Sequence, residues 1–137
     1  MNLQQAFEDA LSRLGSGDYA SLAARDKLLV AIWGVEADVN KGGFDLYYFN
    51  ASSDHAGDVP AALREIGAHK MAEIVESANA QFGEGGPPTE QSARQNALFD
   101  ITDANASVWM ELDSAFLQYP DNLAALLVQR FELTSVF

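Results

Sequence analysis

The sequence contains no cysteine, which excludes disulfide bonds, thiolate nucleophiles and cysteine-based zinc sites together. A chain without cysteine suits a reducing compartment, and residues 1–7 lack the basic and apolar regions of a secretory leader. The longest strongly apolar stretch, residues 28–33, is far too short to span a bilayer. We therefore expect a cytoplasmic protein with no membrane partner.

Basic side chains are also scarce, since 8 Lys and Arg stand against 20 Asp and Glu and give a formal net charge of -12. Binding to nucleic acid or to an anionic lipid surface requires a basic face, so the composition excludes both as direct partners. A net charge of about 2 to 8 is enough to keep a small domain soluble. The excess therefore needs an explanation, although composition alone favours plain solubility.

The apolar content is sufficient for a folded core, because 48% of the 137 residues are hydrophobic. A chain of this length fits one hydrophobic core, so we expect a single domain over residues 1–137. Apolar residues recur at helical rather than alternating spacing. This spacing predicts an all-α, single-domain helical bundle of about seven helices.

Glycine, proline and capping residues give the expected helix limits. Ser21, Asp58 and Asp121 are expected as N-caps, and Gly42 and Gly43 are expected to break a helix. In the helix after the Gly- and Pro-rich loop at residues 83–88, Arg94 is expected on the exposed face. The expected helices cover residues 3–14, 21–40, 44–49, 58–66, 68–82, 89–101, 108–117 and 121–131.

No phosphate loop, dinucleotide fingerprint, metalloprotease helix or calcium loop occurs in the sequence. His55 and His69 lack a second ligand at helical spacing, and we interpret both as surface residues. Pairs of acids are plentiful, but pairs arise by chance among 20 acids and are expected on solvated faces. We therefore expect no enzyme, no cofactor and no metal site.

Residues 36–52 combine two glycines with a dense run of aromatic side chains. Asn40, Gly42 and Gly43 can adopt left-handed backbone conformations, and the aromatic residues that follow can bury a sharp corner between helices. We favour a packed interhelical corner. The alternative is a ligand pocket, with a binding or enzymatic role, built from Glu36, Asn40, Tyr47 and Asn50.

The same segment carries a family resemblance. Its pattern resembles the signature of a bacterial family of small acidic all-helical domains whose named member is a DNA mimic protein, and the matching positions are Glu36, Val39, Asn40, Gly42, Gly43, Phe44, Tyr47 and Asn50. Supporting matches extend the resemblance over residues 22–132, at Ala61-Ala62-Leu63, Ile66-Gly67-Ala68, Pro87-Pro88 before Arg94, and Leu112-Asp113 with Phe116. The chain departs from the family pattern at Lys41, which replaces an Asn, and at Leu46-Tyr47-Tyr48, where the family has Gln-Tyr-Phe.

The resemblance implies a non-enzymatic protein that presents a DNA-like negative surface to a basic DNA-binding protein or transcription regulator and competes with DNA. Duplex DNA carries one charge per roughly 1.7 Å of axis, whereas acids three or four residues apart on a helix are about 5 to 6 Å apart. One helix cannot reach that density. Mimicry would therefore need acidic rows from two helices side by side, or a homodimer that sets two acidic faces in line.

The excess negative charge lies toward the C-terminal half of the chain. Helical phase predicts the partner-binding charge face at Glu73, Glu76, Asp100, Asp103, Glu111 and Asp113. Two other hypotheses remain, the pocket described above and a protein-interaction module that uses an apolar patch while its charge serves only solubility.

Overall fold

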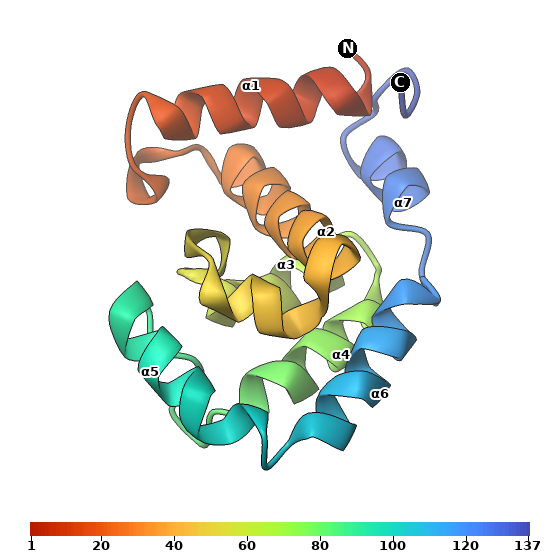
Figure 1. The fold of residues 1–137 in the computed structure, drawn as a ribbon. Helices are drawn as coiled ribbons and strands as arrows, with labels where there is room; N and C mark the ends of the chain where they lie inside the picture. The colour runs from red at the N-terminus through yellow and green to blue at the C-terminus, as the bar shows by residue number, and fades with distance from the viewer.

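The computed structural model describes all of residues 1–137 and contains seven α-helices and no strand (Figure 1). The predicted all-α class is therefore confirmed. The helices are α1 (Leu3–Gly15), α2 (Ala24–Phe49), α3 (Val59–Glu65), α4 (His69–Ala80), α5 (Gln91–Thr102), α6 (Ala106–Leu117) and α7 (Leu123–Arg130).

Helix α2 runs through the middle of the molecule, and α1, α3, α5 and α6 all pack against it (Figure 1). Its side chains Leu29, Ile32 and Val35 are fully buried and form the centre of the core. Helix α4 contacts both α3 and α6. The two chain ends lie side by side, because the Leu3 amide donates to the Ser135 carbonyl at 2.9 Å.

The break expected at the glycine pair is present as a kink inside α2. Gly43 has φ 78° and ψ -176°, and Gly42 also leaves helical geometry, so the chain turns sharply before the helix resumes at Phe44. A backbone with this φ is strained for any residue with a side chain. The kink turns the last segment of α2 toward α5 and α6 (Figure 1).

The start of α2 differs from the expectation. The helix begins at Ala24, not after Ser21, and Ser21 ends a short 3-10 turn that Asp18 caps. Asp18 Oδ1 accepts from the Ser21 amide at 2.9 Å while the Ser21 hydroxyl bonds back to Asp18. The Ser21 hydroxyl is therefore hydrogen-bonded within the preceding turn and does not cap α2.

Of two further expected caps, one holds in position and one is wrong. Asp58 occupies the N-cap position of α3, but its side chain makes no capping bond and accepts instead from the Tyr19 hydroxyl at 3.3 Å. Asp121 accepts from the Met71 amide at 2.9 Å, and its neighbour Asn122 caps α7. In both cases the carboxylate accepts its hydrogen bond from a residue that is distant in the sequence.

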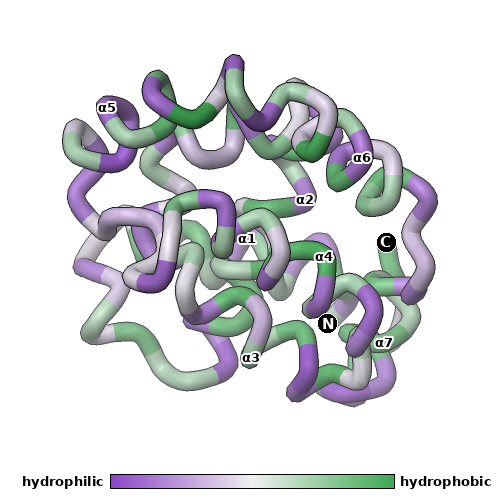
Figure 2. Tube along the Cα trace, turned by 90° about the horizontal axis from the view of Figure 1, so that it is seen from below, coloured by the Kyte–Doolittle hydropathy of each residue, from purple (hydrophilic) through white to green (hydrophobic).

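The expected orientation of α5 is confirmed at Leu98, which is buried, and at Ser92, which is exposed, but it is wrong at two other positions. Arg94 was expected on the exposed face, yet its side chain is fully buried, while Ala93, expected to face inward, is exposed. Hydrophobic and hydrophilic residues are mixed along α5 and α6 (Figure 2), so the apolar pattern of α5 defines its inner face poorly. No helix of the chain is both long enough and apolar enough to cross a membrane.

Candidate functional site

The kink in α2 is held by an acid from another helix. Asp113 of α6 accepts a hydrogen bond from the Phe44 amide at 2.8 Å, which satisfies the first N–H after the kink. A Cβ atom on Gly43 would lie 2.5 Å from Asp113 Oδ2, so the approach requires glycine. The pKa of Asp113 is raised overall, mainly by burial. The hydrogen bond from the Phe44 amide lowers it in part, and the nearby charge of Asp45 raises it further.

The aromatic residues after the kink are packed into the core. Phe44, Tyr47 and Tyr48 are fully buried, and the Phe44 ring lies 6.4 Å from the Trp109 ring and 5.7 Å from the Phe116 ring. These rings join the end of α2 to α6. The corner is therefore a packed aromatic junction.

The four residues considered for the alternative pocket do not form one. Tyr47 lies in the core, and the four residues considered for the pocket, Glu36, Asn40, Tyr47 and Asn50, line none of the main surface cavities. The Tyr47 hydroxyl is buried without a hydrogen-bond partner, and burial raises its pKa. The four residues do not converge on a common space.

One of them, Asn40, fastens α2 to the chain beyond α6. The side-chain amide of Asn40 donates to the Glu36 backbone carbonyl in the same helix and to the Tyr119 hydroxyl, both at 2.7 Å. Burial raises the pKa of Glu36, although the nearby Tyr119 hydroxyl lowers it. Tyr119 itself has a positive φ of 47°, so this contact holds a strained residue in place.

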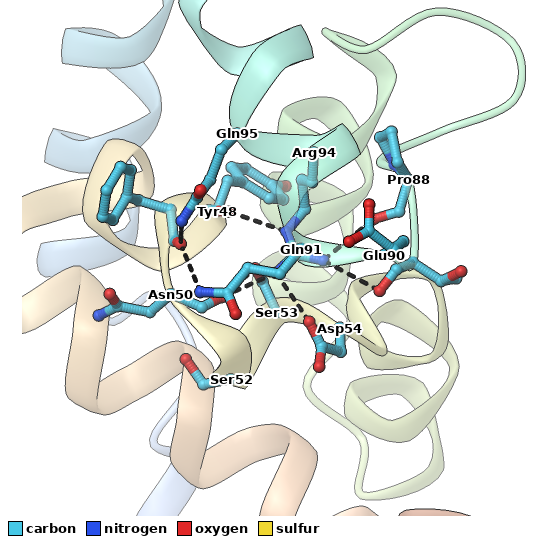
Figure 3. Close-up of polar contacts among 12 residues, drawn as sticks. Tyr48, Asn50, Ser52, Ser53, Asp54, Pro88, Glu90, Gln91, Arg94 and Gln95 are labelled. Atoms are coloured by element: carbon cyan, nitrogen blue, oxygen red, sulfur yellow. Dashed lines mark hydrogen bonds and ion pairs between the residues drawn. The ribbon is translucent and has the colours of Figure 1, made fainter.

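Arg94 is a central structural residue that the sequence reasoning missed. Its guanidinium donates to four backbone carbonyls and to the Asp54 carboxylate, and it joins the end of α2 to the loop before α5 (Figure 3). The acceptors are Tyr48 O at 2.8 Å, Pro88 O at 3.0 Å, Thr89 O at 3.3 Å, Asn50 O at 2.9 Å and Asp54 Oδ1 at 2.8 Å.

The sequence did hold a signal for this role. Arg94 is the single basic residue between Lys70 and Arg130, in a stretch where every other charged residue is acidic. A lone base in such a stretch fits a fixed partner inside the fold better than a solvated position.

Residues 71–129 carry a surface without any exposed base. This stretch contains one basic residue, the buried Arg94, and the acids Glu73, Glu76, Glu84, Glu90, Asp100, Asp103, Glu111, Asp113 and Asp121. We call the exposed surface of residues 71–129 the acidic surface. The buried guanidinium of Arg94 is paired with the partly exposed carboxylate of Asp54, which lies outside residues 71–129.

The six acids expected on the charge face fall into two groups. Glu76 is paired with Arg64 at 3.1 Å, and Asp113 is turned inward to the Phe44 amide. The other four are exposed and have no hydrogen bond or ion pair, namely Glu73, Asp100, Asp103 and Glu111. They lie on α4, at the end of α5 and on α6, and α4 and α6 pack against each other.

A family model described as DMP19-like protein matches residues 20–133. The chain belongs to the DMP19-like protein family. The resemblance expected from the Gly-Gly-Phe segment is thereby confirmed over nearly the same range. No curated protein and no solved structure matches the chain.

In this DMP19-like chain the family motif is architectural. Gly43 and Phe44 form the kink, Asn40 fastens α2 to Tyr119, and the Asn50 carbonyl binds Arg94. The motif therefore explains the shape of the DMP19-like fold and leaves its exposed acids outside the motif. A functional role for charge must be sought on the acidic surface.

Proposed function

We propose that this DMP19-like chain acts in the cytoplasm as a non-enzymatic DNA mimic. Its acidic surface binds a basic DNA-binding protein, such as a transcription regulator, and competes with DNA for that protein. The observation that carries the proposal is that residues 71–129 contain no exposed base, so that Glu73, Asp100, Asp103 and Glu111 have no ion-pair partner, while Glu76 is paired with Arg64 from outside this stretch. A surface dominated by charge of one sign steers a protein of opposite charge.

The placement of two acids adds support. Asp100 lies in the last turn of α5 and Asp103 at its C-cap, and no basic residue lies in that turn. The helix macrodipole disfavours negative charge at a C-terminus, so each acid costs about 0.3 to 1 kcal/mol where it is. Acids kept at an unfavourable position are typical of residues that serve binding at the expense of stability.

The packing of α4 against α6 also suits the proposal. Glu73 on α4 and Glu111 on α6 come from neighbouring helices, and duplex-like charge density requires acids from helices that lie side by side. One copy supplies few such acids. A homodimer that aligns two acidic surfaces would extend the charged row, and we include this dimer in the proposal.

The experiment begins by capturing a partner. The full chain is immobilised, exposed to native lysate at low salt and eluted with a salt gradient. We expect a basic DNA-binding protein to elute at moderate salt, because exposed charge pairs are screened within about 10 Å at 0.1 M salt. The purified partner is then bound again in the presence of duplex DNA. Displacement by DNA supports the proposal, and a partner that binds DNA and this chain simultaneously contradicts it.

Two triple variants with equal charge change test the surface itself. The first carries Asp100→Asn, Asp103→Asn and Glu111→Gln. The second carries Glu8→Gln, Asp9→Asn and Glu132→Gln. Both raise the net charge by the same amount, but only the first alters the acidic surface. Equal loss of binding in the two variants would show that total charge, and not this surface, attracts the partner.

A further inference from the structure

A groove separates the end of α2 from α5. Its volume is about 580 Å³, and its lining includes Asp45, Leu46, Phe49, Leu98, Phe99 and Asp103. Gly42 of the kink also lines the groove, whereas the buried rings of Phe44, Tyr47 and Tyr48 do not. The groove is formed by the turn that the glycine pair gives to α2 and by α5 packed beside it.

The groove exposes aromatic surface that the fold does not use. Phe99 is 73% exposed and Phe49 is 45% exposed, while Leu98, which also lines the groove, is buried. Two phenylalanine side chains in one groove form a concentrated apolar site, and such sites mark ligand or partner contacts. An apolar side chain inserted between them would remove both rings from water.

The backbone carbonyl of Phe49, beside the groove, already has its hydrogen bonds. The Phe49 carbonyl accepts from the side-chain amides of Gln91 at 3.2 Å and Gln95 at 2.8 Å, two residues that reach across from α5 (Figure 3). The Phe49 carbonyl is therefore not available to the backbone of a partner, and we place recognition on the side chains of the groove.

The charges beside the groove have one sign. Asp45 and Asp103 line it, and no basic side chain does. The Thr102 hydroxyl donates to the Leu98 carbonyl at 2.6 Å and lies 3.3 Å from Asp45 Oδ1, so it leaves the charge of Asp45 unneutralised. An apolar site between unneutralised acids repels nucleic acid and anionic lipid, and it complements an apolar side chain flanked by Lys or Arg.

We propose that this groove binds a segment of a partner protein that carries one apolar anchor between basic side chains. The anchor inserts beside Phe99 and Phe49, and the flanking bases meet Asp45 and Asp103. This inference depends on the proposed function only for the identity of the protein that supplies the segment. It adds a short-range apolar contact to an attraction that would otherwise be purely electrostatic, and so gives specificity that a uniform negative charge lacks.

The first test uses two synthetic peptides of equal charge and the full chain. One peptide carries a tryptophan flanked by lysines, and the other carries serine in place of the tryptophan. Fluorescence anisotropy should show the tryptophan peptide binding at least about tenfold more tightly. Amide NMR shifts should cluster at Phe49, Leu98 and Phe99. Equal binding of both peptides, shifts elsewhere, or no binding up to about 1 mM would overturn the proposal.

The second test uses matched alanine variants. Phe99→Ala should weaken the tryptophan peptide about tenfold or more, whereas Met110→Ala should not. Met110 is also 73% exposed, but it lies on α6 and does not line the groove. Since both side chains are largely outside the core, both variants should remain folded by circular dichroism. Equal affinity of the two variants, or a self-association that Phe99→Ala abolishes, would overturn the proposal.

The captured DNA-binding protein separates this inference from the proposed function. If the Asp100, Asp103 and Glu111 variant loses that protein and Phe99→Ala does not, the groove proposal fails and the DNA-mimic proposal stands. If the peptide binds the groove but no captured protein competes with DNA, the mimic proposal fails and the groove remains a docking site.

Discussion

Replacing Gly43 by alanine tests the construction of the kink in α2. At φ 78° and ψ -176° an alanine backbone is strained by on the order of 1 to 3 kcal/mol. The new Cβ would also lie 2.5 Å from Asp113 Oδ2 and 2.9 Å from its Cγ. Asp113 must then move and abandon the Phe44 amide, which adds about 1 to 3 kcal/mol for a donor left without its partner. We expect a total loss of about 2 to 6 kcal/mol, a large part of the stability of an ordinary domain.

Urea unfolding followed by circular dichroism measures this loss, and a double-mutant cycle assigns it. In an Asp113→Ala background the carboxylate is absent, so Gly43→Ala should cost only the backbone strain. Gly15→Ala is the control, because nothing lies within 4 Å of a Cβ at Gly15, and it should be neutral or slightly stabilising. The reasoning is refuted if Gly43→Ala costs less than about 1 kcal/mol, or if its cost is equal in both backgrounds.

Three further predictions concern Arg94, Glu36 and α5. Arg94→Met should lower the free energy of unfolding by about 3 to 5 kcal/mol, because Asp54 and four carbonyls lose their donor. A loss below about 1 kcal/mol in urea unfolding would contradict the role assigned to Arg94. Burial raises the pKa of Glu36 above 4.5, so the folded protein holds the carboxyl proton of Glu36 more tightly than the unfolded chain does. The folded protein therefore loses stability as pH rises through the folded-state pKa. Glu36→Gln should therefore gain stability relative to the parent between pH 4.5 and neutrality, and a difference that does not change with pH would be evidence against this. Asp100→Asn and Asp103→Asn should each raise stability by about 0.3 to 1 kcal/mol at low salt in thermal melts, and a loss would contradict the dipole argument.

The helix class, most helix limits and the kink could be predicted from the sequence, because local features determine them. Glycine and proline mark the loop at residues 83–88, and the glycine pair marks the kink, without reference to any distant residue. Helical spacing of apolar residues was enough to predict an all-α fold. The family resemblance followed from the same glycines and aromatic residues.

The positions of individual polar side chains could not be predicted, because their partners are distant in the sequence. Arg94 donates to the carbonyls of Tyr48 and Asn50, which are 46 and 44 residues away. The weak apolar face of α5 does not indicate that Arg94 is buried. Asp113 looked like a surface acid on α6, but its partner is the Phe44 amide 69 residues away. Of the six expected acids, the structure therefore leaves four free and gives structural partners to Asp113 and Glu76.

The central claim is that the acidic surface competes with DNA for a basic protein. The most direct measurement is the affinity of the captured DNA-binding protein for this chain across a salt series, with duplex DNA as competitor and with the two triple variants. We predict displacement by DNA, a steep loss of affinity with salt, and at least about tenfold weaker binding when Asp100, Asp103 and Glu111 are neutralised. Neutralising Glu8, Asp9 and Glu132 should change the affinity little. Equal effects of the two variants, or binding that DNA does not displace, would contradict the claim.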